Sequence, residues 1–182
     1  MKKIFLIPII IFVSLGSILL FQFISLAEGK LHIVFCNVGQ GDAIFIKTPD
    51  NLDILVDGGP NDSVLSCLGN NMPFWDKRLE LVILTHPHAD HLNGLISVAK
   101  NYEIVQFATE KLKNKTQGFL YLMDLIKKQS INIRYIYAGD KFRFKDGLGL
   151  EIVGPTKECL QLTSPHAFIG ESGEFASVET LV

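Results

Sequence analysis

Residues 79–85 read Leu-Glu-Leu-Val-Ile-Leu-Thr, and residues 85–91 continue as Thr-His-Pro-His-Ala-Asp-His. The first segment is nearly all apolar, which is typical of a strand covered on both faces. The second holds three of the five histidines of the chain, beside one carboxylate. A helix is predicted over residues 91–100. The cluster therefore lies where a buried strand meets a helix, the usual edge for sites in α/β sheets.

The candidate metal ligands in this stretch are His86, His88, Asp90 and His91. In an extended segment His86, His88 and Asp90 project to one side, and Pro87 disfavours helix at the residue before it. His91 opens the predicted helix and can approach from a second direction. Imidazole and carboxylate ligands without thiolate suit zinc, manganese or iron. The alternative is a surface loop that happens to be rich in histidine.

Working outward, strand and helix patterns alternate along the rest of the chain. Apolar alternation and turn residues predict hairpins first and strand–helix alternation afterwards, hence an α/β fold with a mixed sheet and helices on its outer face. No period emerges after Gly154. The other predicted strands are 31–36, 43–47, 53–57, 104–108, 132–137, 141–144 and 148–153, and the other predicted helices are a short one from Asn61 or Asp62 to Leu68 and one over 116–128.

Residues 1–27 are predicted to be a signal peptide or a signal anchor. Two lysines precede a segment from Ile4 to Ala27 that holds no charged residue. As a helix these 24 positions would span about 36 Å, against a hydrocarbon core of about 30 Å. Ser25-Leu26-Ala27 matches the pattern that signal peptidase reads. Both alternatives place residues 28–182 outside the cytoplasm, either secreted or held at the membrane by the uncleaved helix.

The remaining composition is that of an ordinary globular domain. Without residues 1–27 the chain keeps 15 basic and 19 acidic side chains, which excludes a basic nucleic-acid tail. The three cysteines, Cys36, Cys67 and Cys159, have no CxxC spacing. A disulfide framework and a cysteine-rich zinc site are therefore disfavoured. Three small apolar fillers are the favoured interpretation, and one disulfide with a leftover thiol is the alternative.

The pattern HxHxDH after an apolar strand resembles the metal-binding motif of the metallo-β-lactamase superfamily. Val38-Gly-Gln-Gly-Asp-Ala43, followed by an apolar strand that ends in Asp-Gly, resembles the hydrolase-like domain of ComEC proteins, the DNA-uptake channels of natural competence. The resemblance covers about residues 31–153. It implies the N-terminal part of an αββα sandwich, preceded by the hydrophobic leader, with two divalent metal ions, zinc first and manganese as the alternative.

The same resemblance assigns roles to individual residues. His86 and His88 would bind one metal ion, and Asp90 and His91 a second. Asp90 is also the expected catalytic residue, since it would help to orient the attacking water. Asp57 is expected to orient a ligand imidazole or, with equal weight, to serve only as a turn residue.

The glycine turn before the second strand has a structural role in this interpretation. Gly39 and Gly41 are expected to turn the chain, and Asp42 to stabilise that turn by bonding backbone amides.

The sequence departs from the ComEC pattern in several places. Asn37 stands where aspartate is more usual, and His88 restores the full superfamily pattern where ComEC-type domains commonly have aspartate. The later metal-binding histidines and the bridging aspartate of a Thr-Gly-Asp turn have no match. His166 is interpreted as a loop histidine. We therefore expect residues 28–182 to be an incomplete domain, the first part of a longer protein.

Residues 111–145 form a basic segment with 9 basic and 2 acidic side chains. Aromatic residues are interleaved with these charges, an arrangement that can bind single-stranded nucleic acid. A solvated helix end and loop is the favoured alternative, because the domain as a whole is not basic. The aromatic residues are Phe119, Tyr121, Tyr135, Tyr137, Phe142 and Phe144.

Three functions remain open from the sequence. The first is an exported metal-dependent hydrolase of phosphodiesters in nucleic acid, in which two ions would activate a water and clamp the attacking and leaving oxygens. The second is a β-lactamase-like amide hydrolase, which shares HxHxDH and an export leader. The third is a DNA-handling module with an incomplete site. The expected partner is single-stranded DNA or another phosphodiester substrate, with the membrane if the leader is retained; protein partners are not indicated.

Overall fold

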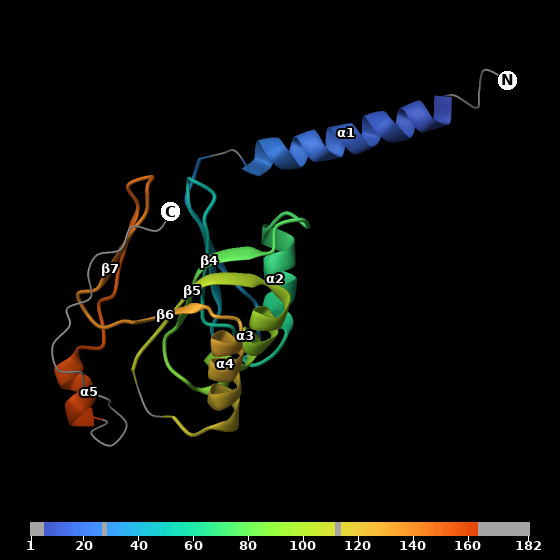
Figure 1. Cartoon of the computed structure of the whole chain (residues 1–182). Coiled ribbons are helices and arrows are strands. Elements are labelled where there is room, and N and C mark those ends of the chain that lie inside the picture. The colour runs from blue at the N-terminus through green and yellow to red at the C-terminus, as the bar shows by residue number, and fades with distance from the viewer. Residues whose placement is uncertain (1–5, 27–28, 112–113, 164–182) are drawn as a thin grey trace.

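The computed structural model describes residues 6–26, 29–111 and 114–163 (Figure 1). His166 and the last residues of the chain lie outside them, so the expectations for that region stay untested. In chain order the elements are α1 (Leu6–Leu26), β1 (His32–Phe35), β2 (Ile44–Lys47), β3 (Asp53–Val56), α2 (Ser63–Asn71), β4 (Arg78–Leu84), α3 (Ala89–Asn101), β5 (Glu103–Thr109), α4 (Gln117–Lys128), β6 (Asn132–Tyr135), β7 (Lys141–Arg143), β8 (Gly149–Glu151) and α5 (Lys157–Thr163).

The main sheet has six strands in the order β1-β2-β3-β4-β5-β6. The first three pair antiparallel and β3 to β6 pair parallel. Short turns allow the antiparallel pairs, whereas α2, α3 and α4 are the crossovers that parallel neighbours require. The prediction of an α/β fold with a mixed sheet is confirmed. Because β1 and β3 to β6 all point the same way, their C-terminal ends share one edge of the sheet.

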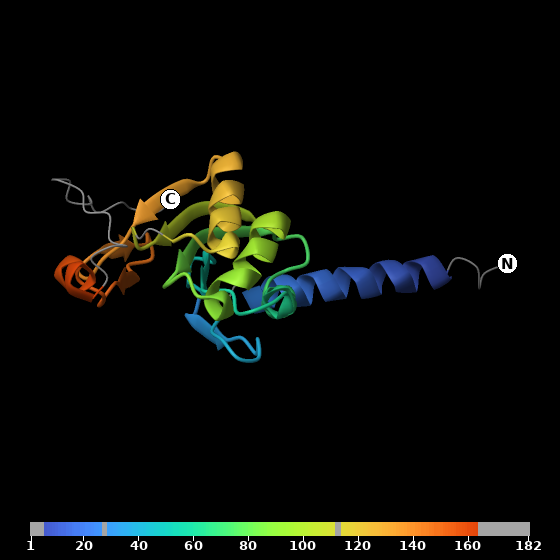
Figure 2. The same ribbon diagram turned by 90° about the horizontal axis from the view of Figure 1, so that it is seen from below.

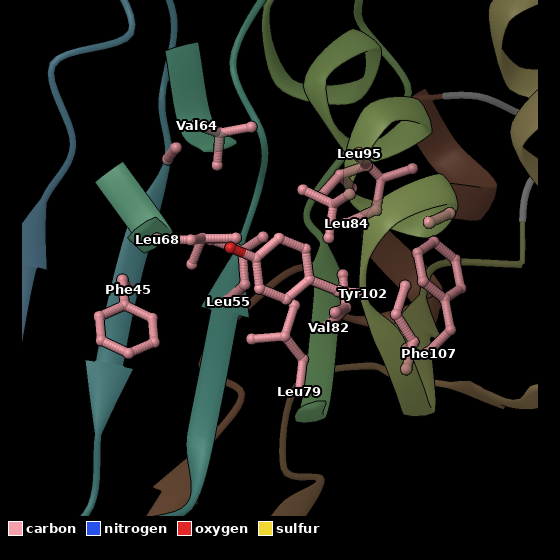
Figure 3. Packing of buried hydrophobic residues seen from close by; sticks show 14 of the residues in the cluster. Phe45, Leu55, Val64, Leu68, Leu79, Val82, Leu84, Leu95, Tyr102 and Phe107 are labelled. Carbon is pink, nitrogen blue, oxygen red and sulfur yellow. The ribbon is translucent and has the colours of Figure 1, made fainter. Parts of the chain in front are cut away.

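Helices α2, α3 and α4 cover one face of this sheet (Figures 1 and 2). Figure 3 shows Phe45, Leu55, Val82 and Phe107 of the strands meeting side chains of α2 and α3 such as Leu68 and Leu95. The opposite face packs against the two-stranded sheet of β7 and β8, where Phe142 and Phe144 are buried. The central strands are thus covered on both faces, as the apolar run of β4 predicts.

Helix α1 is confirmed as a helix over most of the predicted leader. Its large apolar side chains from Ile7 to Ile18 are exposed. Within the part of the chain that the structure describes, no helix is long and apolar enough to cross a membrane.

Two expectations from the sequence are corrected. Cys36 and Cys67 form a disulfide, with their Cα atoms 5.7 Å apart, so the interpretation as unpaired fillers is wrong for these two. The pairing joins the end of β1 to α2 across 31 residues, a contact that only tertiary packing creates. Helix α5 begins at Lys157, where no period was visible because seven residues are too few to show one.

Candidate metal centre

Three loops meet at the edge formed by the C-terminal ends of the parallel strands. They are residues 38–43 after β1, 57–59 after β3 and 85–91 after β4. The amide of Asp42 donates to the carbonyl of Asp90 over 3.3 Å. In the turn after β3, the amide of Gly59 donates to the carbonyl of Asp42 over 2.8 Å, and the amide of Gly58 donates to the carbonyl of His91 over 2.7 Å. The backbone alone therefore ties the two glycine turns to the histidine segment.

Glycine is required where these loops touch. A Cβ atom at Gly41 would meet the carbonyl oxygen of Asp90, and the φ of Gly41 is +148°. A Cβ atom at Gly94 of α3 would meet the carbonyl oxygen of Gly58. Gly39 has a φ of +83° with open space around it, so it serves the turn itself. The motif VGQGDA thus positions the histidine segment as well as turning the chain.

Asp57 is the buried centre of the site, with 3% of its surface exposed. Its Oδ1 accepts from the Thr85 amide over 2.8 Å, and its Oδ2 accepts from the Thr85 hydroxyl over 2.6 Å. The same Oδ2 lies 2.9 Å from Nδ1 of His91. Asp57 therefore bonds the imidazole of His91, a contact compatible with the orienting role that the sequence interpretation gives to Asp57. Thr85 was missed; its only signal was its position directly before the first histidine.

These bonds indicate which nitrogen of each ring remains available. The Thr85 hydroxyl donates to Asp57, so its oxygen can accept from Nδ1 of His86, 3.0 Å away. Nδ1 of His91 likewise donates to the carboxylate of Asp57. In both rings this hydrogen-bond network assigns the proton to Nδ1 and leaves Nε2 as the lone-pair atom. Burial, with help from the neighbouring His91 and His88, lowers the pKa of His86 below its ordinary 6.5, which favours the neutral form that binds metals.

The three imidazole rings form one cluster. The ring centroid of His86 lies 4.6 Å from that of His88 and 4.0 Å from that of His91. His88 is the N-cap residue of α3, with extended backbone and no side-chain capping bond. Its side chain is therefore not needed to start the helix.

The expected placement of Asp90 in an extended segment is wrong. Helix α3 begins at Ala89, two residues before the predicted start, so Asp90 belongs to its first turn. Its Oδ2 still lies 3.7 Å from Nε2 of His91, the next residue of the helix.

Asp42 holds its turn through the backbone bonds given above. Its carboxylate is 72% exposed and lies 3.9 Å from Nε2 of His91. The side chain thus faces the histidine cluster, whereas the sequence interpretation expected it to bond backbone amides.

The chemistry of this donor set fits a divalent metal ion. Among residues 6–26, 29–111 and 114–163, no three His, Cys, Asp or Glu side chains stand in a ready ligand arrangement. Nε2 of His91 nevertheless faces the carboxylate of Asp90 within 4 Å, and His86 and His88 adjoin its ring. Imidazole nitrogens with carboxylate oxygens are ligands that suit zinc or manganese.

Comparison with known proteins gives relatives of the same kind. Exodeoxyribonuclease WalJ of Streptococcus pneumoniae strain D39 is 20% identical over 132 residues, which cover 72% of this chain and 47% of the relative. Exodeoxyribonuclease YycJ of Bacillus anthracis is 26% identical over 91 residues, 50% of this chain and 34% of the relative. The metallo-beta-lactamase fold-containing protein ST1585 of Sulfurisphaera tokodaii is 24% identical over 114 residues, 61% of this chain and 41% of the relative.

The chain spans less than half the length of these relatives. The family model described as the beta-lactamase superfamily domain matches residues 53–161, more than half of the chain. That match covers Asp57, the histidine cluster and the second small sheet. The chain therefore belongs to the metallo-β-lactamase superfamily.

Proposed function

We propose that this chain belongs to an exported, metal-dependent hydrolase of phosphodiester bonds in DNA. The observation that carries the proposal is the cluster of His86, His88 and His91, with His91 bonded to the buried carboxylate of Asp57. Hydrolases of the superfamily commonly use metal ions, and two of the relatives are named exodeoxyribonucleases. The substrate class is taken from those relatives.

In this proposal His86 and His88 would hold one divalent ion, and Asp90 and His91 another, zinc or manganese. Such ions supply Lewis acidity and lower the pKa of a bound water to about 7. Asp57 keeps the proton of His91 on Nδ1 and directs Nε2 toward Asp90. The Thr85 hydroxyl, which donates to Asp57, accepts from Nδ1 of His86 and so keeps the proton of that ring on Nδ1 as well. The carboxylate of Asp90 is 45% exposed, so a substrate water can reach it.

The finer fold assignment is also a proposal. We infer that the six-stranded sheet is the first half of an αββα sandwich and that β7 and β8 begin its second sheet. The small sheet packs on the face opposite the helices, which is where a second sheet would lie. On that same face Leu31, Ile33 and Phe35 of the β1 region are exposed. The Val38–Ala43 motif supports a ComEC-type branch.

Export is supported by the covalent chemistry of the domain. The disulfide between Cys36 and Cys67 is typical of proteins outside the reducing cytoplasm. The apolar leader α1 precedes it. Both features agree with the proposed extracytoplasmic location, whether the leader is cleaved or retained.

The test compares the protein with its His88→Ala variant. Zinc and manganese binding is measured by calorimetry, and hydrolysis by release of label from single- and double-stranded DNA, with a chromogenic β-lactam as the second substrate. We expect DNA hydrolysis that needs metal and is lost in His88→Ala together with most of the metal affinity. Because the side chain of His88 makes no capping bond, the variant should fold normally. Full turnover by the variant, or β-lactam hydrolysis without DNA hydrolysis, would refute the proposal.

A further inference from the structure

Two tyrosines near the C-terminal end of β6 each lie beneath a lysine ammonium group. Nζ of Lys111 is 5.2 Å from the ring centroid of Tyr135, and Nζ of Lys157 is 4.8 Å from that of Tyr137. Tyr135 is 37% exposed and Tyr137 is half-buried. Tyr137 also forms a hydrogen bond with the backbone of Lys111, which joins the end of β5 to the end of β6. We call these four residues the tyrosine–lysine platform.

The platform lies on the same sheet edge as the histidine cluster. Strands β3 to β6 are parallel, so the residues that follow β4, β5 and β6 leave the sheet on one side. Figure 1 shows β4, β5 and β6 side by side. Strand β6 is two places from β4, which corresponds to about 10 Å along the edge. A polymer bound at the cluster and running along this edge toward β6 would reach the platform after a short distance.

The other aromatic side chains of the basic segment have different roles. Phe142 and Phe144 are buried in the core beneath β7 and β8, and Phe119 packs against the helix-side core. Tyr121 lies on α4, where Nζ of Lys100 approaches its ring to 5.1 Å. Of the six aromatic residues in the basic segment, only Tyr135, the last residue of β6, and Tyr137, two residues beyond it, lie at the C-terminal end of a strand of the main sheet.

We propose that the tyrosine–lysine platform binds single-stranded DNA next to the hydrolytic site, a proposal that rests on the DNA-hydrolysing function above. Tyr135 stacks on a base, and Lys111 and Lys157 contact the flanking phosphates. Aromatic rings interleaved with lysines bind single strands of any sequence, because every base has a face that can stack. A duplex hides its base faces, so the platform selects unpaired ends.

The test measures binding separately from hydrolysis. The full chain is titrated into a fluorescently labelled single-stranded oligonucleotide in EDTA, and anisotropy gives the dissociation constant. Tyr135→Ala should weaken binding by roughly 5- to 100-fold, the loss of one stacked base, whereas Tyr135→Phe should keep it. Lys111→Gln should reduce the slope of log K against log salt by about 0.7.

Tyr121→Ala is the matched control. Tyr121 is 45% exposed and pairs with a lysine like Tyr135 does, but Lys100 sits in the last turn of α3, at the far end from the histidine cluster. This variant should bind as the unaltered chain does. Equal weakening in Tyr121→Ala, no weakening in Tyr135→Ala, or equal affinity for duplex would overturn the platform.

The nuclease assay separates the two proposals. If Tyr135→Ala hydrolyses DNA as fast as the unaltered chain does, the platform proposal is refuted and the proposed function stands. If DNA binding depends on Tyr135 but the chain shows no metal-dependent hydrolysis, the platform proposal is supported and the proposed function is refuted.

Discussion

Replacing Asp57 by asparagine tests the central bond network of the site. Asparagine has nearly the same shape as aspartate and tolerates the left-handed backbone that Asp57 adopts, with a φ of +57°. The substitution therefore removes the charge and one acceptor atom without straining the turn.

The expected cost follows from the bonds that Asp57 accepts. Oδ1 receives the Thr85 amide, and Oδ2 receives the Thr85 hydroxyl and Nδ1–H of His91. In the variant one of these two atoms becomes an NH₂ group that cannot accept, so at least one buried donor loses its partner. That loss costs about 1–3 kcal/mol of unfolding free energy. If His91 is freed, the zinc affinity should also fall by about 10- to 100-fold.

The assay combines urea unfolding of the metal-free chain with zinc titration. Asp50→Asn is the matched control, because Asp50 is exposed in the turn between β2 and β3, at the opposite sheet edge. It should change the unfolding free energy by less than about 0.5 kcal/mol and leave zinc affinity unaltered. An Asp57→Asn chain that unfolds at the same urea concentration and binds zinc equally well would refute the role assigned to Asp57.

Three further changes test the packing of the fold. Reducing the Cys36–Cys67 disulfide, which spans 31 residues, should lower the unfolding free energy by about 3–4 kcal/mol in urea titrations under reducing conditions. Gly94→Ala should lower the unfolding free energy by about 1–3 kcal/mol, because the added methyl group forces α3 away from the turn after β3. Gly69→Ala is the control: this glycine of α2 has open space around it, so the change should raise the unfolding free energy by about 0.5–1 kcal/mol. Equal effects of the two changes in thermal melting would contradict the close contact at Gly94. Burial raises the pKa of Asp53 from 3.8 to about 6, so the folded state holds this proton more tightly than the unfolded state does. This group should lower the unfolding free energy by about 2 kcal/mol as pH rises from 4 to 6, and Asp53→Asn should remove that contribution.

The order of strands and helices could be predicted from local pattern. The run 79–85 appears as β4 with its end one residue earlier, and the stripe over 116–128 appears as α4. These elements can be predicted because apolar spacing, turn residues and flanking charges are short-range signals in the sequence. The superfamily was likewise predictable, since HxHxDH is contiguous and follows a strand.

The start of α3 shows where local pattern failed. Ala89 and Asp90 join the helix because His88 takes the N-cap position and Gly94 packs against Gly58. Nothing near residue 89 in the sequence marks that packing.

The sequence by itself determined the alternation of elements, the cluster of candidate ligands and the strand-end position of His86, His88 and His91. Only the tertiary structure decided that Asp57 bonds Thr85 and His91, respectively 28 and 34 residues away. It also decided that Cys36 pairs with Cys67. The physical reason is that backbone propensities act over a few residues, whereas these bonds form only after packed helices and a parallel sheet bring distant loops to one edge.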